Sequence, residues 1–205
     1  MHRRALLSAL PVLALGACSK APGLLAPPAT VPTSGRTAQL MVAAHAQTKH
    51  FVWYDSGYTK IPYPNGDVAA GKGVCADVVI RAYRALGIDL QKLVHEDMLA
   101  HFDLYPKRWG LKAPDANIDH RRVPNLMVFF SRFGQVLPLT HDPKDYRPGD
   151  ILATKPYGPH IAIVSDQPSL FDRDRLTVIQ NIGHGVNVDD ALFSYPLLGH
   201  YRYAL

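Results

Sequence analysis

The segment Gly71–Gly87, GKGVCADVVIRAYRALG, passes from a glycine-rich turn into a helical pattern that begins at a cysteine. Apolar residues recur at the i, i+3, i+4, i+7 spacing of one helix face: Val79, Ala82, Tyr83 and Leu86. Gly87 is a typical helix stop. Cys75 therefore falls in the first turn, where the helix macrodipole and free backbone N–H groups favour the nucleophilic thiolate. Cys75 is a candidate catalytic nucleophile, and the alternative is a small buried apolar residue.

The other cysteine, Cys18, ends a segment typical of bacterial export. Met1-His2-Arg3-Arg4 is followed by an apolar stretch from Ala5 to Leu15 and by Leu15-Gly16-Ala17-Cys18. A basic start, a short apolar core and small residues before a cleavage point indicate a secretion signal too short for an ordinary transmembrane helix. We predict a lipoprotein signal peptide over residues 1–17 and lipidation at Cys18. An ordinary secretion signal is the alternative, and the arginine pair leaves the twin-arginine route open.

These features predict where the protein resides. The chain is expected to cross the inner membrane and to be lipid-anchored in the periplasm. Ser19 follows Cys18, in place of the aspartate that retains lipoproteins at the inner membrane. We therefore expect the outer membrane to carry the anchor.

The mature chain is long enough for one domain with a full core. Removing residues 1–17 from the 205 leaves 188 residues. Loss of Arg3 and Arg4 takes the formal net charge from +5 to +3, and no run of basic residues with interleaved aromatics follows. A nucleic-acid partner is therefore not expected. With Cys18 lipidated, Cys75 has no partner for a disulfide within the chain. The oligomeric state stays open.

The domain is expected to contain helices first and strands afterwards. Residues 18–35, rich in Pro, Ala, Ser and Thr, predict a flexible tether, and residues 36–205 the folded domain. Besides the Cys75 helix, helices are expected at Arg36–Lys49, Leu90–Phe102 and Pro124–Phe133. Strands are expected at Gly149–Ala153, Ile161–Val164, Leu176–Gln180 and His200–Tyr203. This order predicts an α+β fold with helices packed on a small antiparallel sheet.

A thiol nucleophile needs a base, and the base needs a group that orients it. His160 is the best candidate base because it opens a predicted strand after the turn Gly158-Pro159. Gln180 and Asn181 end the next strand and carry amides that can accept a hydrogen bond from an imidazole. Since successive strand residues face opposite sides, one of the two points at His160. We favour Asn181, whose shorter side chain is more rigid.

Other charged and histidine residues carry weaker signals. His95 and His101 are six residues apart, which is not the i, i+4 spacing of a zinc helix, so we expect them to face solvent. His184 lies in a glycine-flanked loop and is a candidate substrate contact. Asp119–Arg122 either anchors an anionic group or forms a charged helix start. No metal or nucleotide fingerprint is present, so no metal and no cofactor is expected.

Two resemblances follow from these segments. Arg147–Leu152, RPGDIL, and Pro159–Asp166, PHIAIVSD, resemble strands of the NlpC-type papain-like cell-wall hydrolases. Gly73–Ala82, Ile118–Leu126 and Asn181–Gly183 resemble an uncharacterised family of bacterial envelope proteins, domain of unknown function 1287, over nearly all of residues 37–205.

The resemblance implies a papain-like, NlpC-type fold with Cys75 as nucleophile and His160 as base. The third residue varies in that group, so Gln180 and Asn181 both stay open. NlpC-type enzymes usually carry Asp-Cys-Ser-Gly, whereas Val-Cys-Ala-Asp stands here, which leaves the substrate undefined. A tyrosine ahead of the cysteine often lines the site.

Tyr63, with Tyr54 behind it, is the corresponding tyrosine here. Asp77, in the changed flank of the cysteine, joins these tyrosines among the candidate substrate contacts.

The sequence predicts an envelope cysteine hydrolase that cleaves an amide bond, with peptidoglycan peptides as the substrate class. Two alternatives remain: a non-catalytic module of the same fold that binds wall or partner, and a thiol acyltransferase. An inert Cys75 would favour the first alternative, and transfer to an added amine or alcohol the second.

Overall fold

The computed structural model describes residues 29–205. The predicted signal peptide, Cys18 and the first part of the tether lie outside the described residues, so their assignment stays a prediction. The last tether residues run beside the sheet, where the Val31 N–H donates to the Asp166 carbonyl at 2.7 Å. Within residues 29–205, none of the helices combines the length and apolarity needed to cross a bilayer.

The helices occur where the sequence places them. The α-helices are α1 Gly35–Ala46, α2 Cys75–Ala85, α3 Leu90–Ala100 and α4 Val123–Phe133. Short 3₁₀ turns are η1 Gln47–Lys49, η2 Phe102–Leu104, η3 Asp119–Arg121 and η4 Pro143–Asp145. After α2 the chain reverses at Gly87, whose φ of +76° is one that an L side chain rarely adopts. Asp89 caps α3 by accepting from the Lys92 N–H.

The strands form one antiparallel sheet of six and one parallel pair. The sheet order is β3 Gln135–Val136, β8 Leu197–Arg202, β4 Ile151–Thr154, β5 His160–Pro168, β6 Leu176–Asn181 and β7 Val186–Asp189. The pair is β1 Trp53–Tyr54 with β2 Lys72–Gly73. The predicted α+β class with helices on an antiparallel sheet is confirmed. The sequence reading missed β7, whose four residues follow a glycine loop.

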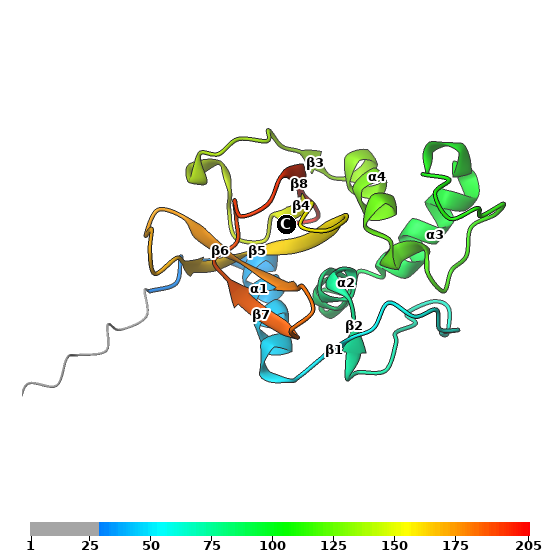
Figure 1. Ribbon diagram of the computed structural model, residues 1–205, viewed down its shortest axis with the longest axis horizontal. Helices are drawn as coiled ribbons and strands as arrows, with labels where there is room; N and C mark the ends of the chain where they lie inside the picture. The colour runs from blue at the N-terminus through cyan, green and yellow to red at the C-terminus, as the bar shows by residue number, and fades with distance from the viewer. Residues whose placement is uncertain (1–28) are drawn as a thin grey trace, which may run out of the picture.

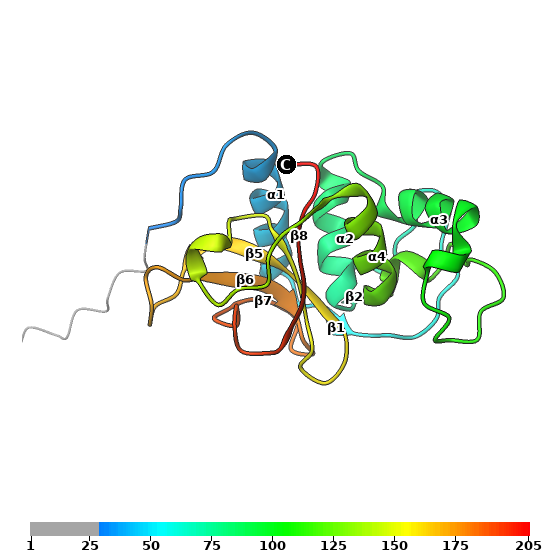
Figure 2. The same cartoon turned by 90° about the horizontal axis from the view of Figure 1, so that it is seen from above.

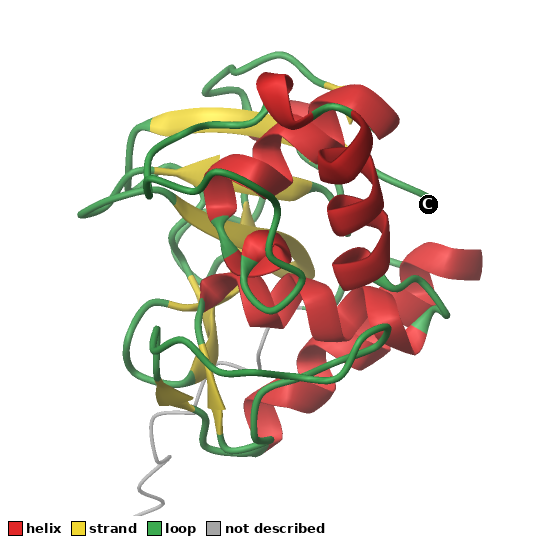
Figure 3. Cartoon of the chain, turned by 90° about the vertical axis from the view of Figure 1, so that its right-hand side faces the viewer, coloured by secondary structure: helices red, strands yellow, loops and turns green. Residues whose placement is uncertain are grey.

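Helix α2 lies at the centre of the molecule, between the sheet with α1 and the pair α3 and α4 (Figure 1, Figure 2). Eight of its eleven residues are buried, so the helix serves as the core on which the other elements pack. The sheet has two apolar faces. Ile161, Ile163 and Ile179 pack in one cluster with α2, while Ala162 and Val164 pack in a second cluster. Figure 3 shows the helices grouped to one side of the strands.

A buried charge network joins β8 to the start of β4. The Arg202 guanidinium donates to both oxygens of Asp150 at 2.7 and 2.8 Å. His200 Nε2 lies 2.9 Å from the same carboxylate, and its Nδ1 lies 3.1 Å from the Pro138 carbonyl oxygen. Both ring nitrogens thus face an oxygen acceptor, which fixes the orientation of the ring.

Candidate active site

Cys75 is the first residue of α2 and lies at the wall of a cavity of about 520 Å³. Its side chain is 5 % exposed. Aromatic, basic and proline residues supply much of the rest of the wall: Tyr54, Tyr58, Trp109, Arg108, Arg121, Arg122, Pro124 and Pro159. The thiol is thus nearly buried yet borders a space the size of a small-ligand pocket.

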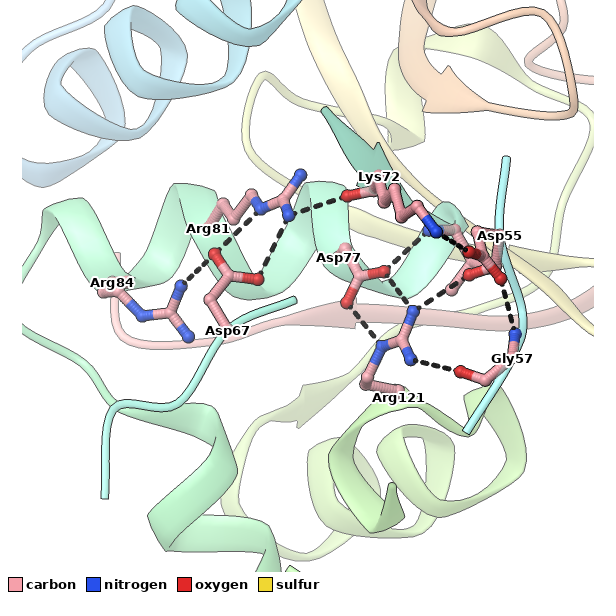
Figure 4. A network of polar contacts seen from close by, with 9 residues as sticks. Asp55, Gly57, Asp67, Lys72, Asp77, Arg81, Arg84 and Arg121 are labelled. Atoms are coloured by element: carbon pink, nitrogen blue, oxygen red, sulfur yellow. Dashed lines mark hydrogen bonds and ion pairs between the residues drawn. The ribbon is translucent and has the colours of Figure 1, made fainter. Parts of the chain in front are cut away.

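One buried guanidinium fixes the start of α2. Arg121, on η3, donates to both carboxylate oxygens of Asp77 at 2.9 and 2.8 Å, and to the carbonyls of Asp55 and Gly57 (Figure 4). Asp77 in turn accepts from the Val74 N–H at 2.6 Å and so caps the helix. A single ion pair therefore ties the first turn of α2 to η3 and to the loop after β1.

Three polar groups lie against the Cys75 thiol. They are the backbone N–H groups of Ala76 and Ile161 and the hydroxyl of Tyr54. Burial raises the pKa of Tyr54 far above its ordinary value, so its hydroxyl stays protonated beside the thiol.

These donors favour the thiolate, but burial has the larger effect and raises the pKa of Cys75. The helix start was expected to favour the thiolate, and the net shift of the Cys75 pKa runs the other way. Desolvation outweighs the helix terminus, and the resting group is a neutral thiol.

A hydrogen-bonded relay crosses three strands on the face of the sheet that carries Ala162 and Val164. His160, the first residue of β5, directly follows Pro159 of the cavity wall. Its Nε2 lies 2.8 Å from Gln180 Oε1 on β6, and Gln180 Nε2 donates to Asp189 Oδ2 on β7 at 2.9 Å. The carboxylate accepts only, so Asp189 fixes which way the Gln180 amide points.

The relay also fixes the tautomer of His160. Since Gln180 presents its carbonyl oxygen, Nε2 carries the ring proton and Nδ1 carries the lone pair. Burial lowers the pKa of His160, and the Gln180 hydrogen bond and the Asp189 charge oppose that effect without cancelling it. The ring is therefore neutral near pH 7, with Nδ1 available as a proton acceptor.

Gln180, and not Asn181, is the amide that meets His160. The pairing of Val164 with Val178 puts Gln180 on the face of the sheet that carries His160. Asn181 falls on the opposite face, where its side-chain oxygen accepts from the Gly183 N–H. The preference for Asn181 is thus corrected. The strand register decides the partner, and rigidity of the side chain does not.

The comparisons place this arrangement in a family. Residues 41–203 match the family described as "Domain of unknown function (DUF1287)". The chain belongs to the DUF1287 family. It is 47 % identical over 182 residues to "Uncharacterized protein YijF" of Escherichia coli (strain K12), covering 86 % of this chain and 87 % of that protein.

Two solved structures resemble this DUF1287 chain. They are NlpC2 and NlpC1 from Trichomonas vaginalis, each 16 % identical with a TM-score of 0.45 over 84 % of this chain. The chain spans about half the length of each, 48 % and 46 % respectively.

Of the four predicted substrate-contact residues of this DUF1287 domain, one lines the cavity and three do not. Tyr54 lines the cavity beside the thiol. Tyr63 packs its ring against His95 at 5.3 Å, outside the cavity wall. Asp77 is not available to a substrate, because Arg121 and the Val74 N–H occupy its carboxylate. His184 sits in the turn between β6 and β7, where its carbonyl lies 3.4 Å from the Asn187 amide.

The sequence analysis did not predict two charged residues that organise this site, Asp189 and Arg121. Asp189 was hidden because β7 was not predicted, and a short strand after a glycine loop gives little periodic signal. Arg121 belongs to the segment Asp119–Arg122, for which the sequence predicts either an anion anchor or a charged helix start. The available signal was Asp77, two residues after Cys75 in the first turn of the helix, because a carboxylate that becomes buried there requires a cationic partner. In the described part of the chain, no group of three or more His, Cys, Asp or Glu side chains is placed to hold a metal.

Proposed function

We propose that this DUF1287 protein is a cysteine hydrolase of the cell envelope that cleaves an amide bond in peptidoglycan peptides. One observation carries the proposal: Cys75, the first residue of α2, lines a cavity of about 520 Å³. The resemblance of Arg147–Leu152 and Pro159–Asp166 to NlpC-type hydrolases supports the substrate class. The predicted lipid anchor at Cys18 would place the enzyme at the periplasmic face of the outer membrane, within reach of the wall.

The chemistry starts from a neutral pair. His160 Nδ1 takes the proton of the Cys75 thiol as Sγ attacks the carbonyl carbon of the amide. Ile161 is the β5 residue that packs in one cluster with α2, and His160 alternates with it. The step therefore requires the His160 end of β5 to shift and bring Nδ1 within hydrogen-bond reach of Sγ when substrate is bound. The negative charge on the carbonyl oxygen is stabilised by the Cys75 N–H, which has no partner within the helix because it lies in the first turn.

The intermediate then breaks down in two steps. His160 returns the proton to the amide nitrogen, the C–N bond breaks, and an amine leaves a thioester on Cys75. Water attacks the thioester and loses its proton to His160, which restores the thiol as the acid product departs. Gln180 holds the ring in the required tautomer throughout, since its amide is fixed by Asp189.

The test is release of new amines from purified muropeptides, followed by mass spectrometry. Wild-type protein should release them, and the substitution Cys75→Ala should abolish the release. Cys18→Ser is the matched control, because it removes the other cysteine and should leave hydrolysis unchanged. Equal activity of wild type and Cys75→Ala would remove Cys75 from the mechanism.

A second candidate function has one observation in its favour. The thiol is nearly buried and its pKa is raised, as suits a structural cysteine in a module that binds wall peptides without cleaving them. In that case wild-type protein and Cys75→Ala would bind muropeptides equally and release no amine.

A further inference from the structure

Two arginines in the Cys75 cavity have no acidic partner. Arg108 and Arg122 both line the cavity wall, and across residues 29–205 neither has a carboxylate within ion-pair distance. The third cavity arginine differs, since Arg121 is committed to Asp77. Arginines near a surface ordinarily meet carboxylates or water, so two unpaired guanidinium groups facing one cavity call for an explanation.

Arg122 is held in a position to bind rather than to fold away. Its guanidinium stacks on the ring of Trp109, 4.1 Å from the centroid, which holds it in place without using its donors. Its Nη1 is buried and has no hydrogen-bond partner in the structure. A buried donor without a partner costs free energy, and a ligand that supplies an acceptor would recover it.

Two carboxylates near Arg122, Asp115 and Asp119, form no ion pair with it in residues 29–205. Asp115 accepts hydrogen bonds from Tyr58 and Asn117. Asp119 is buried, and burial raises its pKa to about 6, so it carries its charge less readily than an ordinary aspartate. Both carboxylates interact with the Arg122 charge, but neither lines the cavity, whose wall includes Arg108, Arg121 and Arg122 and, among the described residues, no acidic residue.

We propose that Arg108 and Arg122 form a carboxylate-binding subsite in the cavity of Cys75, so that the ligand carries a carboxylate beside the bond at the thiol. Planar guanidinium groups bind carboxylates with two parallel hydrogen bonds, which suits this ligand class. The cavity of about 520 Å³ also contains the thiol, so the carboxylate belongs to the residue at the scissile amide or its neighbour. Binding of a carboxylate at this subsite does not depend on the proposed hydrolysis. A role of the subsite in selecting the substrate rests on the proposed function.

The first experiment compares two alkylating reagents that differ by a carboxylate. Full-length protein with Cys18→Ser has Cys75 as its single thiol. Iodoacetate and iodoacetamide are reacted with it, and the ratio of their rates is divided by the same ratio for N-acetylcysteine. The subsite should raise this corrected ratio above one, and Arg108→Gln with Arg122→Gln should lower it about three- to tenfold. The effect should shrink at about 1 M salt, where screening is strong.

The matched control is Arg173→Gln, an exposed arginine in the β5–β6 connection far from the cavity wall. It removes the same charge and should leave the corrected ratio unchanged. A ratio that is equal in wild type and the double variant, or that falls equally in Arg173→Gln, overturns the subsite.

The second experiment does not depend on a reactive thiol. N-acetylglutamate and N-acetylglutamine are titrated while the indole N–H signal of Trp109 is followed by NMR. The acid should shift the signal and the amide should not, and Arg122→Gln should remove the shift.

The two proposals then fail separately. An inert Cys75 with a carboxylate-dependent shift would overturn the hydrolase and keep the subsite. Amine release by wild-type protein, without any shift and without a reagent preference, would keep the hydrolase and overturn the subsite.

Discussion

Two buried aspartates, Asp77 and Asp150, each form an ion pair with an arginine, and the two pairs have different roles. Asp77 and Arg121 form a pair whose side chains are 3 % and 2 % exposed, at the start of α2. Asp150 pairs with Arg202 and His200 at the end of β4 that lies away from His160. Both carboxylates accept two bonds from one guanidinium. The difference is that the first pair positions the thiol and its cavity, while the second holds two strands together. Similar chemistry can thus serve a site or a fold, and location decides which.

The largest effect is expected from Arg121→Met. Removing one member of a fully buried ion pair leaves Asp77 uncompensated, so the free energy of unfolding should fall by about 3–5 kcal/mol in chemical denaturation. The alkylation rate of Cys75 should also change, because Asp77, which caps α2, loses the guanidinium that holds it in place. The double variant Asp77→Leu with Arg121→Met should recover much of the stability but not the wild-type alkylation rate. A single variant as stable as wild type would contradict the role of this pair.

A smaller effect is expected from Arg202→Met. Asp150 keeps His200 as a hydrogen-bond partner, and the Arg202 side chain is 23 % exposed, so the loss should be about 1–3 kcal/mol. Alkylation of Cys75 and amine release should stay at wild-type rates wherever the variant is folded. If this variant changed the thiol as much as Arg121→Met, the distinction between the two pairs would break down.

Two neighbouring amides of β6, Gln180 and Asn181, allow a closer comparison between a residue of the site and a residue of the fold. Gln180→Leu removes the acceptor that sets the His160 tautomer and should lower kcat by about tenfold or more, equivalent to ~1.4 kcal/mol. Asn181→Leu is the adjacent amide variant, and its side chain faces the other side of the sheet. Its effect on kcat, measured on folded protein, should be much smaller. The reverse ranking would reinstate Asn181 as the orienting residue.

The smallest effect is expected from Asp189→Asn, and it is a shift in the pH dependence of activity. The negative charge of Asp189 raises the pKa of His160, and burial lowers it more strongly. Because the neutral ring is the base, activity should rise through the His160 pKa at a pH below about 6.5. Removing the Asp189 charge should move this acid limb to still lower pH.

The matched control for the pH profile is Asp190→Asn. Asp190 is the next residue along the chain, but its carboxylate pairs with Arg175 and Ser169. It should leave the acid limb of kcat/KM where it is in wild type. A shift toward higher pH in Asp189→Asn would contradict the relay.

Local patterns located most of the elements. The helix from Cys75 to Ala85, its stop at Gly87, and the later helices all show 3.6-residue periodicity or clear end signals, so each could be predicted from its own residues. β5 and β6 contain runs of β-branched residues, and β4 follows a Pro-Gly turn, so these strands could be predicted in the same way. The two-residue strands and β7 could not be predicted, because short segments bounded by loops carry too little pattern.

Some features of the candidate site could likewise be predicted from the sequence, and others could not. Cys75 at a helix start and His160 at a strand start are positions that neighbouring residues define. The pKa of Cys75 was mispredicted because it depends on how much protein surrounds the thiol, a quantity the helix start alone does not contain.

The order of residues by itself determined the helix that begins at Cys75, the strand that His160 opens, and the mixed α+β class. These depend on interactions between residues a few positions apart. Only the tertiary structure decided that Gln180 rather than Asn181 meets the ring, that Asp189 fixes the amide, and that Arg121 holds α2. The physical reason is that each of these contacts joins segments 9 to 44 residues apart, whose register and burial are set by the packed core as a whole.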